Sequence, residues 1–317
     1  MTKREALAKT AEVLPKTISI RIDIDTLVGL KKGVPRILDC FKIEDIVGTF
    51  FCVMGPDTMG QHMKRFKKGS YWKRILKVNP IKLVQKYGIK SFFYGTLLKS
   101  PRIAGDHPDL IKNVEDHGNE IICHGYNHAG WADDYQKYTP EQMKRELHKS
   151  FDVFKEITGR YPHAAGVPNW RTNYDAIQIC EDFGGFEYLA DVRGDSPFYP
   201  VDDHKIYDCL QIPITLPTTH ELLQADRKRS EVVPDIISQL HEGYNIFCIH
   251  DWFEGLYNMD FVEDFIRMAK EKGYRFMTMQ EAAKTIKESG IEVTKNRIGN
   301  HSLKEGGVKL ITHQLWN

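Results

Sequence analysis

The chain has 317 residues, of which 41% are hydrophobic and 27% charged, and its formal net charge is +1 at pH 7. This composition excludes disordered and fibrous proteins, and the length allows one large α/β domain or two small ones. The six cysteines show no CxxC spacing, so buried thiols in a reducing compartment are expected. No signal peptide and no run of about twenty apolar residues is apparent. We therefore expect a cytoplasmic protein, or one held peripherally on the cytoplasmic face of the inner membrane.

Short β-branched apolar runs alternate with helical stretches along the chain. In chain order, the predicted strands are 18–24, 47–53, 120–123, 163–167, 188–192, 210–214, 245–249 and 275–277. The predicted helices are 34–41, 108–117, 140–158, 174–183, 234–241, 261–272 and 279–289. This alternation indicates parallel βαβ units, and hence a barrel or a doubly wound sheet. No GxGxxG or Walker A motif appears, which disfavours a nucleotide-binding fold.

One segment departs from this alternation of strands and helices and has a high density of positive charge. Residues 61–102 contain twelve Lys or Arg residues and no Asp or Glu, which leaves 32 basic against 43 acidic residues elsewhere. Because aromatic and aliphatic residues are interleaved with the charges, we expect a basic amphipathic insertion that faces an anionic membrane surface. A solvated insertion packed on the domain is the alternative, and nucleic acid is disfavoured because no recognised binding module appears.

A single domain is predicted over residues 17–289. Residues 1–16 and 290–317 are predicted to be terminal extensions, and the polar, Gly-containing carboxyl-terminal one is expected to be loose.

Two motifs that follow predicted strands carry the chemistry. Asp23 and Asp25 are separated by two positions, and residues i and i+2 of a strand share one face. His124 and His128 are four apart and would share a face on one helical turn. Two imidazoles and one carboxylate make a three-ligand site with an open position on Zn²⁺ or a similar ion. A second carboxylate that stays off the metal can act as a general base. Each motif alone is common in structural roles, so their joint appearance is what favours a hydrolase.

Three further strings each follow or end a predicted strand. They are Val167-Pro168-Asn169-Trp170-Arg171, Asp191-Val192-Arg193-Gly194-Asp195 and Ile249-His250-Asp251. With these motifs the chain resembles the polysaccharide deacetylase superfamily (NodB-homology, carbohydrate esterase family 4) from about residue 18 to about residue 284. The resemblance implies an α/β fold, namely a distorted (β/α) barrel of about seven strands. It also implies metal-dependent hydrolysis of N- or O-acyl groups on sugars.

Within that superfamily the chain is most similar to the formamido-deoxyarabinose-phosphoundecaprenol deformylases of lipid A modification. The matching stretches are Arg21–Thr26, Gly33–Arg36, Phe50–Phe51, Gly55–Gly60, Gln211–Thr218, Ile249–His250 and Glu254–Gly255. Those enzymes also carry an insertion at the position of the basic segment.

The resemblance implies a role for each motif residue. The implied metal ligands are Asp25, His124 and His128. The implied catalytic residues are Asp23 as general base, His250 as general acid, Arg171 orienting the base, and Asp191 partnering the acid histidine. Asn169, Trp170 and Glu254 are predicted to contact substrate.

The chain departs from the superfamily pattern in two places. Ile24 separates two aspartates that are usually adjacent, and the string around Arg171 lacks the usual Arg-x-Pro-Tyr order. Other readings stay open: His250 as a strand-end histidine, Asp191 as a barrel-rim or capping residue, and Glu254 as a helix cap.

These residues lead to one main functional hypothesis. We expect an amide hydrolase that removes a formyl or acetyl group from an amino sugar carried on a polyprenyl phosphate. The alternatives are a soluble polysaccharide or oligosaccharide N-deacetylase and a non-catalytic barrel that binds carbohydrate or membrane. A divalent metal is expected as cofactor, with Zn²⁺ first and Mn²⁺ or Co²⁺ also suited to the ligands. The expected partners are the lipid-linked sugar and an anionic membrane surface, with no nucleic acid.

Overall fold

The structure is a computed structural model that describes residues 1–58, 94, 98–303 and 309–316. Most of the basic segment at 61–102 lies outside these residues, so its predicted contact with a membrane is taken up below as a proposal. Among the described residues, no helix has the length and apolar character needed to cross a membrane.

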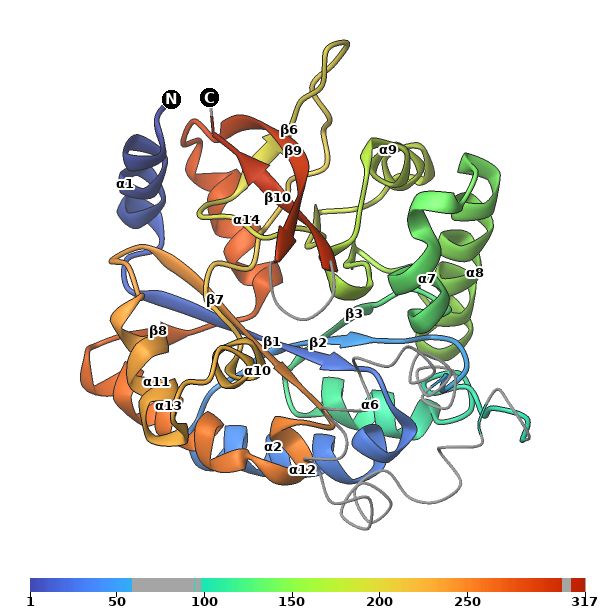
Figure 1. Ribbon diagram of the computed structural model, residues 1–317, viewed down its shortest axis with the longest axis horizontal. Helices are drawn as coiled ribbons and strands as arrows, with labels where there is room; N and C mark the ends of the chain where they lie inside the picture. Colours follow the sequence, from blue (N-terminus) through green and yellow to red (C-terminus); the bar gives the residue numbers. More distant parts are fainter. Residues whose placement is uncertain (59–93, 95–97, 304–308, 317) are drawn as a thin grey trace.

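A curled parallel sheet forms the centre of the molecule, with helices packed around it (Figure 1). Strand β1 (Thr17–Ile24) lies between β2 and β7 in the order β5-β4-β3-β2-β1-β7, and β8 pairs with the start of β1. The other strands of this sheet are β2 (Thr49–Cys52), β3 (Glu120–Cys123), β4 (Ala164–Ala165), β5 (Tyr188–Leu189), β7 (Tyr244–His250) and β8 (Arg275–Phe276). Because the strands are parallel, their carboxyl ends meet at one rim.

The helices follow the predicted alternation, and α8, α9 and α14 have the predicted bounds. The α-helices are α1 (Lys3–Val13), α2 (Val34–Ile43), α6 (Pro108–Asp116), α7 (His128–Asp134), α8 (Pro140–Thr158), α9 (Tyr174–Phe183), α10 (Thr219–Gln224), α11 (Arg229–Ser238), α12 (Glu254–Tyr257), α13 (Met259–Glu271) and α14 (Met279–Ser289). Shorter helical turns are η1 (Gly29–Gly33), η4 (Tyr135–Lys137) and η5 (Pro168–Trp170). Helix α11 begins at Arg229 and contains Pro234, so the prediction that it starts at the proline is wrong.

The segment 210–214, predicted as a strand, forms isolated bridges instead of a regular strand, and it spans the gap between the two ends of the sheet. The Ile212 N–H donates to the carbonyl of Leu189, the last residue of β5 (2.8 Å), and the Leu216 N–H donates to the Ile246 carbonyl of β7 (3.2 Å). Leu210, Ile212 and Ile214 are all buried in the barrel interior. The expectation of a distorted (β/α) barrel is thereby confirmed.

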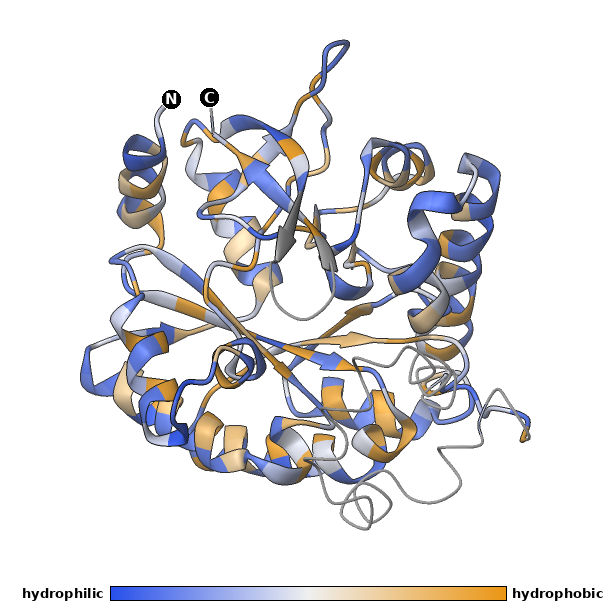
Figure 2. Ribbon diagram, viewed as in Figure 1, coloured by the Kyte–Doolittle hydropathy of each residue, from blue (hydrophilic) through white to orange (hydrophobic). Residues whose placement is uncertain are grey.

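Strand β1 is buried along its whole length, and its side chains alternate between two environments. Ile18, Ile20, Ile22 and Ile24 belong to the large core that includes residues of the helices. Figure 2 shows hydrophobic residues along the central strands and on parts of the surrounding helices. The intervening residues, among them Arg21 and Asp23, therefore face the inside of the barrel. A charged pair inside a barrel is unusual, and it becomes central to the site.

Both predicted terminal extensions are folded against the barrel. Strands β9 (Thr294–Leu303) and β10 (Lys309–Leu315) form an antiparallel hairpin, and β9 also pairs with β6 (Phe198–Pro200). The carboxyl-terminal segment is therefore not the loose extension that its polar sequence suggested. The reason is that its polar side chains are used internally: Thr312 and Gln314, for example, are buried and hydrogen-bonded. At the other end, Ala6 in α1 and Leu14 just after it are buried.

The loops that follow β1 and β7 are packed backbone against backbone. A Cβ atom added at Gly33 would lie 2.0 Å from the Asp251 carbonyl oxygen. The Asp251 carboxylate also accepts hydrogen bonds from the N–H and the hydroxyl of Thr26, both at 3.2 Å. These contacts fix the two loops that carry Asp25 and His250 relative to each other.

We predict that Gly33→Ala destabilises the protein by about 1–3 kcal/mol, because the added methyl group forces these loops apart. The φ and ψ of Gly33 (−80°, −49°) suit alanine, so the cost comes from crowding rather than from backbone strain. Urea unfolding measures it, with the exposed neighbour Lys32→Ala as the control. A Gly33→Ala protein as stable as the control would contradict the close packing.

Candidate active site

The predicted metal ligands come together at the rim where the strands end. Nε2 of His128 lies 3.3 Å from Oδ1 of Asp25, and Nε2 of His124 lies 3.7 Å from the same atom. His124 directly follows β3, whereas His128 is the first residue of α7, which is capped by the Asn127 side chain. Gly125, at φ +75°, makes the turn between them. The histidines therefore converge from a strand end and a helix start, not from one helical turn.

The hydrogen bonding of His124 suits a metal ligand. Its Nδ1 lies 2.6 Å from the Gly166 carbonyl oxygen, which can only accept, so Nδ1 carries the proton and Nε2 presents a lone pair. Burial lowers the pKa of His124 to about 4, which keeps the ring neutral. Within the described part of the chain, Nε2 of His124 and Oδ1 of Asp25 are buried without a hydrogen-bond partner. A divalent cation bound by these residues and His128 would satisfy both atoms.

Asp23 lies within β1, two residues before Asp25, and forms a buried ion pair with Arg21. The guanidinium donates from Nε to Oδ1 of Asp23 (2.5 Å) and from Nη2 to Oδ2 (3.1 Å). Burial alone would raise the pKa of Asp23, but the Arg21 charge, with help from His124, lowers it to about 2. Arg21 is fully buried and also donates to the Ala190 carbonyl (2.8 Å). Asp23 is thus held as a carboxylate that faces the metal ligands.

The predicted partner of Asp23 was Arg171, and the structure places Arg21 there instead. Arg171 lies on the loop after η5 and lines the pocket. The sequence did hold a signal for Arg21, because Arg21 and Asp23 are two apart on a predicted strand and so share a face.

His250 ends β7 and is partnered by Glu254. The His250 N–H donates to Oε2 of Glu254 (2.7 Å), and the ring Nδ1 lies 3.8 Å from the same oxygen. Burial by itself would lower the pKa of His250, but the nearby negative charge of Glu254, together with Asp25 and Asp23, raises it to about 9. The ring is therefore protonated at neutral pH. Glu254 is completely buried, so it lies beneath His250 and does not line the pocket, contrary to its predicted contact with substrate.

Asp191 does not take the predicted place beside His250. It accepts hydrogen bonds from the Val167 N–H (2.8 Å) and the Gln211 amide (3.4 Å). It lies near Arg21, whose charge lowers its pKa, although burial dominates and raises that pKa to about 6. The reason for the difference is topological, because Asp191 follows β5, which is at the opposite end of the sheet from β7. Asp191 therefore supports the loop before Asn169.

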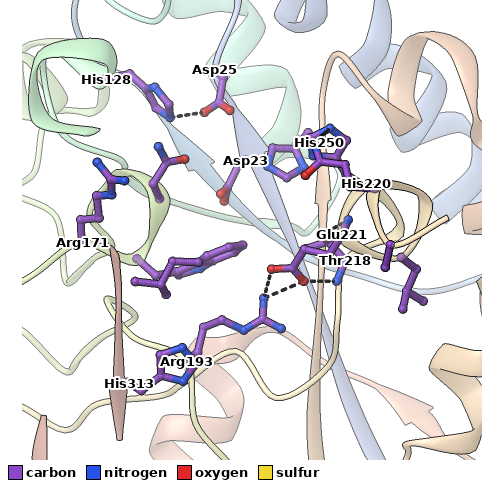
Figure 3. Close-up of a pocket in the computed structure, with 16 residues that line it drawn as sticks. Asp23, Asp25, His128, Arg171, Arg193, Thr218, His220, Glu221, His250 and His313 are labelled. Atoms are coloured by element: carbon purple, nitrogen blue, oxygen red, sulfur yellow. Dashed lines mark hydrogen bonds and ion pairs between the residues drawn. The ribbon is translucent and has the colours of Figure 1, made fainter. Parts of the chain in front are cut away.

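A cavity of about 600 Å³ opens onto these residues. Figure 3 shows Asp25 and His128 at one end, Arg193 and His313 at the other, and Asp23 and His250 between them. The remaining lining residues are Asn169, Trp170, Arg171, Thr218, His220, Glu221, Leu222, Gln224, Ala225 and Ile311. The structure thus places the predicted base, the predicted acid and two predicted metal ligands, Asp25 and His128, in one pocket, with the third, His124, buried beside Asp25.

Asn169 and Trp170 line this pocket in a strained backbone conformation. Their φ angles are +56° and +50°, and a positive φ is a genuine outlier for a bulky residue such as tryptophan. Such strain costs about 1–3 kcal/mol per residue and is concentrated at functional sites. The Trp170 Nε1 atom is buried and has no hydrogen-bond partner among the described residues. Both observations fit the predicted contact of these residues with substrate.

Comparison with known proteins agrees with this geometry. The sequence matches the polysaccharide deacetylase family over residues 11–185. The chain belongs to the polysaccharide deacetylase family. It is accordingly a hydrolase that acts on amide bonds.

Two proteins similar to this chain have names that state a more specific activity than that of the family. The chain is 33% identical to the probable 4-deoxy-4-formamido-L-arabinose-phosphoundecaprenol deformylase ArnD of Shewanella sediminis (strain HAW-EB3), over 83% of this chain and 85% of that protein. It is 29% identical to the protein of the same name from Wigglesworthia glossinidia brevipalpis, over 80% and 88% of the two chains.

Solved structures of polysaccharide deacetylases and related proteins share the fold. A putative polysaccharide deacetylase from Mycobacterium smegmatis superposes with a TM-score of 0.60 at 15% identity, covering 88% of this chain and 93% of its own. The Puue allantoinase superposes with a TM-score of 0.61 at 19% identity, covering 88% and 92%. At these identities the likeness establishes the barrel alone.

We predict that Arg21→Met destabilises the protein by about 3–5 kcal/mol, because it leaves the Asp23 carboxylate buried and uncompensated. The double variant Arg21→Met with Asp23→Asn is expected to be more stable than Arg21→Met alone, since a neutral amide needs no counter-charge. Urea unfolding of the two single variants and the double variant measures the coupling.

The control is Arg267→Met, which removes exposed ion pairs and is expected to cost less than about 1 kcal/mol. Independent, additive effects at Arg21 and Asp23 would show that the pair is not the buried interaction described above.

Proposed function

We propose that this chain is a metal-dependent deformylase of an amino sugar carried on a polyprenyl phosphate. The observation that carries the proposal is the convergence of Asp23 and His250 on a cluster of Asp25, His124 and His128. The names of its relatives support the formylated, lipid-linked sugar as substrate. In this proposal the product, a lipid-linked amino sugar without its formyl group, would be used in lipid A modification.

The two aspartates divide the work of hydrolysis. A divalent cation held by Asp25, His124 and His128 would polarise the amide carbonyl and acidify the attacking water. Asp23, kept ionised by Arg21, accepts the proton of that water as general base. Its low pKa makes it a weak base, so its contribution depends on position and on the acidity of the water.

His250 completes the reaction at the leaving group. The amide nitrogen is a poor leaving group until it is protonated, and His250 lines the pocket with a pKa raised to about 9, so it can donate that proton. Glu254 acts through His250 as a positioning residue, since it is buried and touches the backbone N–H and ring of that histidine.

The identity of the ion and of the acyl group belongs to the same proposal. Two imidazoles and one carboxylate suit Zn²⁺, and Mn²⁺ or Co²⁺ fit the same ligands. Formyl is proposed over acetyl because the relatives are named for a formamido sugar.

A lipid-linked substrate requires the enzyme to work at a membrane surface. We propose peripheral association with the cytoplasmic face of the inner membrane through the basic segment at 61–102. Its twelve Lys or Arg residues without any Asp or Glu suit anionic lipid headgroups, each cation near the surface contributing about 1 kcal/mol.

Incubation of the protein, loaded with Zn²⁺, Mn²⁺ or Co²⁺, with a formylated amino-sugar polyprenyl phosphate is expected to release formate. Mass spectrometry measures the reaction through the loss of the formyl mass from the lipid. Chelation of the metal and the Asp23→Asn variant, which removes the base, are each expected to reduce the rate by at least about a hundredfold. Activity on a chitooligosaccharide but none on the lipid would refute the proposed substrate and favour a soluble oligosaccharide deacetylase.

The Glu254→Gln variant is expected to move the alkaline limb of the pH profile to lower pH. The general acid must be protonated, so activity falls as the pH rises through the pKa of His250, which is about 9. Loss of the carboxylate lowers that pKa, and a shift of about 1–3 pH units is expected.

The profile of kcat/KM measures this shift because it reports the free enzyme. The exposed Glu271→Gln serves as the control. An unchanged alkaline limb in Glu254→Gln would show that His250 is not the acid.

A further inference from the structure

The carboxyl-terminal hairpin forms part of the pocket wall, at the end away from the metal ligands. Ile311 and His313 of β10 line the pocket, and Figure 3 shows His313 near Arg193 at that end. These residues lie more than a hundred positions after the matched family segment, which ends at residue 185.

Alternation along β10 separates lining residues from anchoring residues. Ile311 and His313 face the pocket, whereas Thr312 and Gln314 point into the body of the protein. The Thr312 hydroxyl accepts a hydrogen bond from the Thr172 N–H (3.1 Å) and lies 3.0 Å from the Thr172 carbonyl oxygen. Gln314 accepts from the Asp195 N–H (2.9 Å). The hairpin is thereby hydrogen-bonded to the loop after η5, which carries Arg171, and to the loop after β5, which carries Arg193.

Arg193 joins the hairpin to the opposite wall. Its backbone N–H donates to the Thr312 carbonyl (2.9 Å), and its carbonyl accepts from the Gln314 N–H (2.8 Å). Its guanidinium binds both oxygens of Glu221 (2.8 and 2.9 Å), the residue that also caps α10 through Thr218. Burial of Glu221 would raise its pKa, but Arg193 and the cap lower it, so the pair is charged. One end of the pocket is therefore a connected wall made of β10, Arg193 and α10.

We propose that this wall determines substrate size: Ile311 and His313 close the pocket so that it takes one terminal amino sugar and rejects a sugar polymer. A polymer bound in its middle needs a groove that is open on both sides of the reacting sugar. Here a sugar whose acyl group lies at Asp25 and His128 meets the hairpin on its far side. The inference rests on the proposed function, because a single sugar on a lipid carrier is the substrate that such a closed pocket suits.

The test compares the wild-type protein with the double variant Ile311→Ala and His313→Ala, which opens the wall but keeps Thr312 and Gln314 as anchors. The substrates are N-formylglucosamine and N-formylated glucosamine tetramer, each assayed for formate release by the metal-loaded full chain. We expect the wild type to prefer the monomer, and the double variant to shift the ratio of kcat/KM toward the tetramer by at least about tenfold. The exposed hairpin variant Lys295→Ala, which lies outside the pocket, is expected to keep the wild-type ratio.

Calorimetric binding of glucosamine and its tetramer gives a second readout that needs no turnover, and it is expected to show the same change in preference. Thermal unfolding checks that the double variant is folded. A wild-type preference for the tetramer, or a ratio unchanged in the folded double variant, would overturn the inference. A wild type that prefers the monomer but leaves the lipid-linked sugar intact would refute the proposed function and leave the inference standing.

Discussion

The buried ion pair between Arg21 and Asp23 is the interaction around which the site is built. A carboxylate removed from water is costly unless an opposite charge and hydrogen bonds compensate for it. Arg21 supplies both from two residues earlier on the same strand, so the base is fixed by the backbone of β1. Because β1 lies between β2 and β7, any shift of this strand would move the base relative to His250 and the metal ligands.

This pair also separates two aspartates that look equivalent in the sequence. Arg21 lowers the pKa of Asp23, whereas burial raises the pKa of Asp25 in the absence of a cation. Asp25 shares its surroundings with two histidines whose ring atoms lie within metal-binding reach. A cation there would provide the charge that Asp25 lacks. These opposite electrostatic needs support the proposal that Asp23 is the base and Asp25 a metal ligand.

The walls of the pocket come from parts of the chain that lie outside the barrel strands. The strained Asn169–Trp170 turn forms one side, and strand β10 with Arg193 forms the far end. Of the five residues proposed as acid, base and metal ligands, four lie in or directly after barrel strands, and His128 begins α7. In the proposed function, the selection of a substrate depends on these added walls. On that proposal, the barrel strands and the specificity are encoded in different segments.

The alternation of apolar strands and helices in the sequence predicted parallel βαβ units, and the family resemblance selected a barrel over a doubly wound sheet. The sequence also located residues near strand ends, since Asp25 and His124 directly follow strands, His250 ends one, and Asp23 lies one residue before the end of β1. Partnerships across the chain were decided only by the tertiary structure. Arg21, not the predicted Arg171, pairs with Asp23, and Glu254, not the predicted Asp191, contacts His250. Both outcomes follow from which strands are neighbours and which side chains face the barrel interior. The same holds for the hairpin, whose polar residues resemble a solvated tail until burial pairs them with distant backbone groups. A local sequence pattern indicates which chemistry a residue can perform. The partner that fixes the charge or position of that residue depends on how distant parts of the chain pack together.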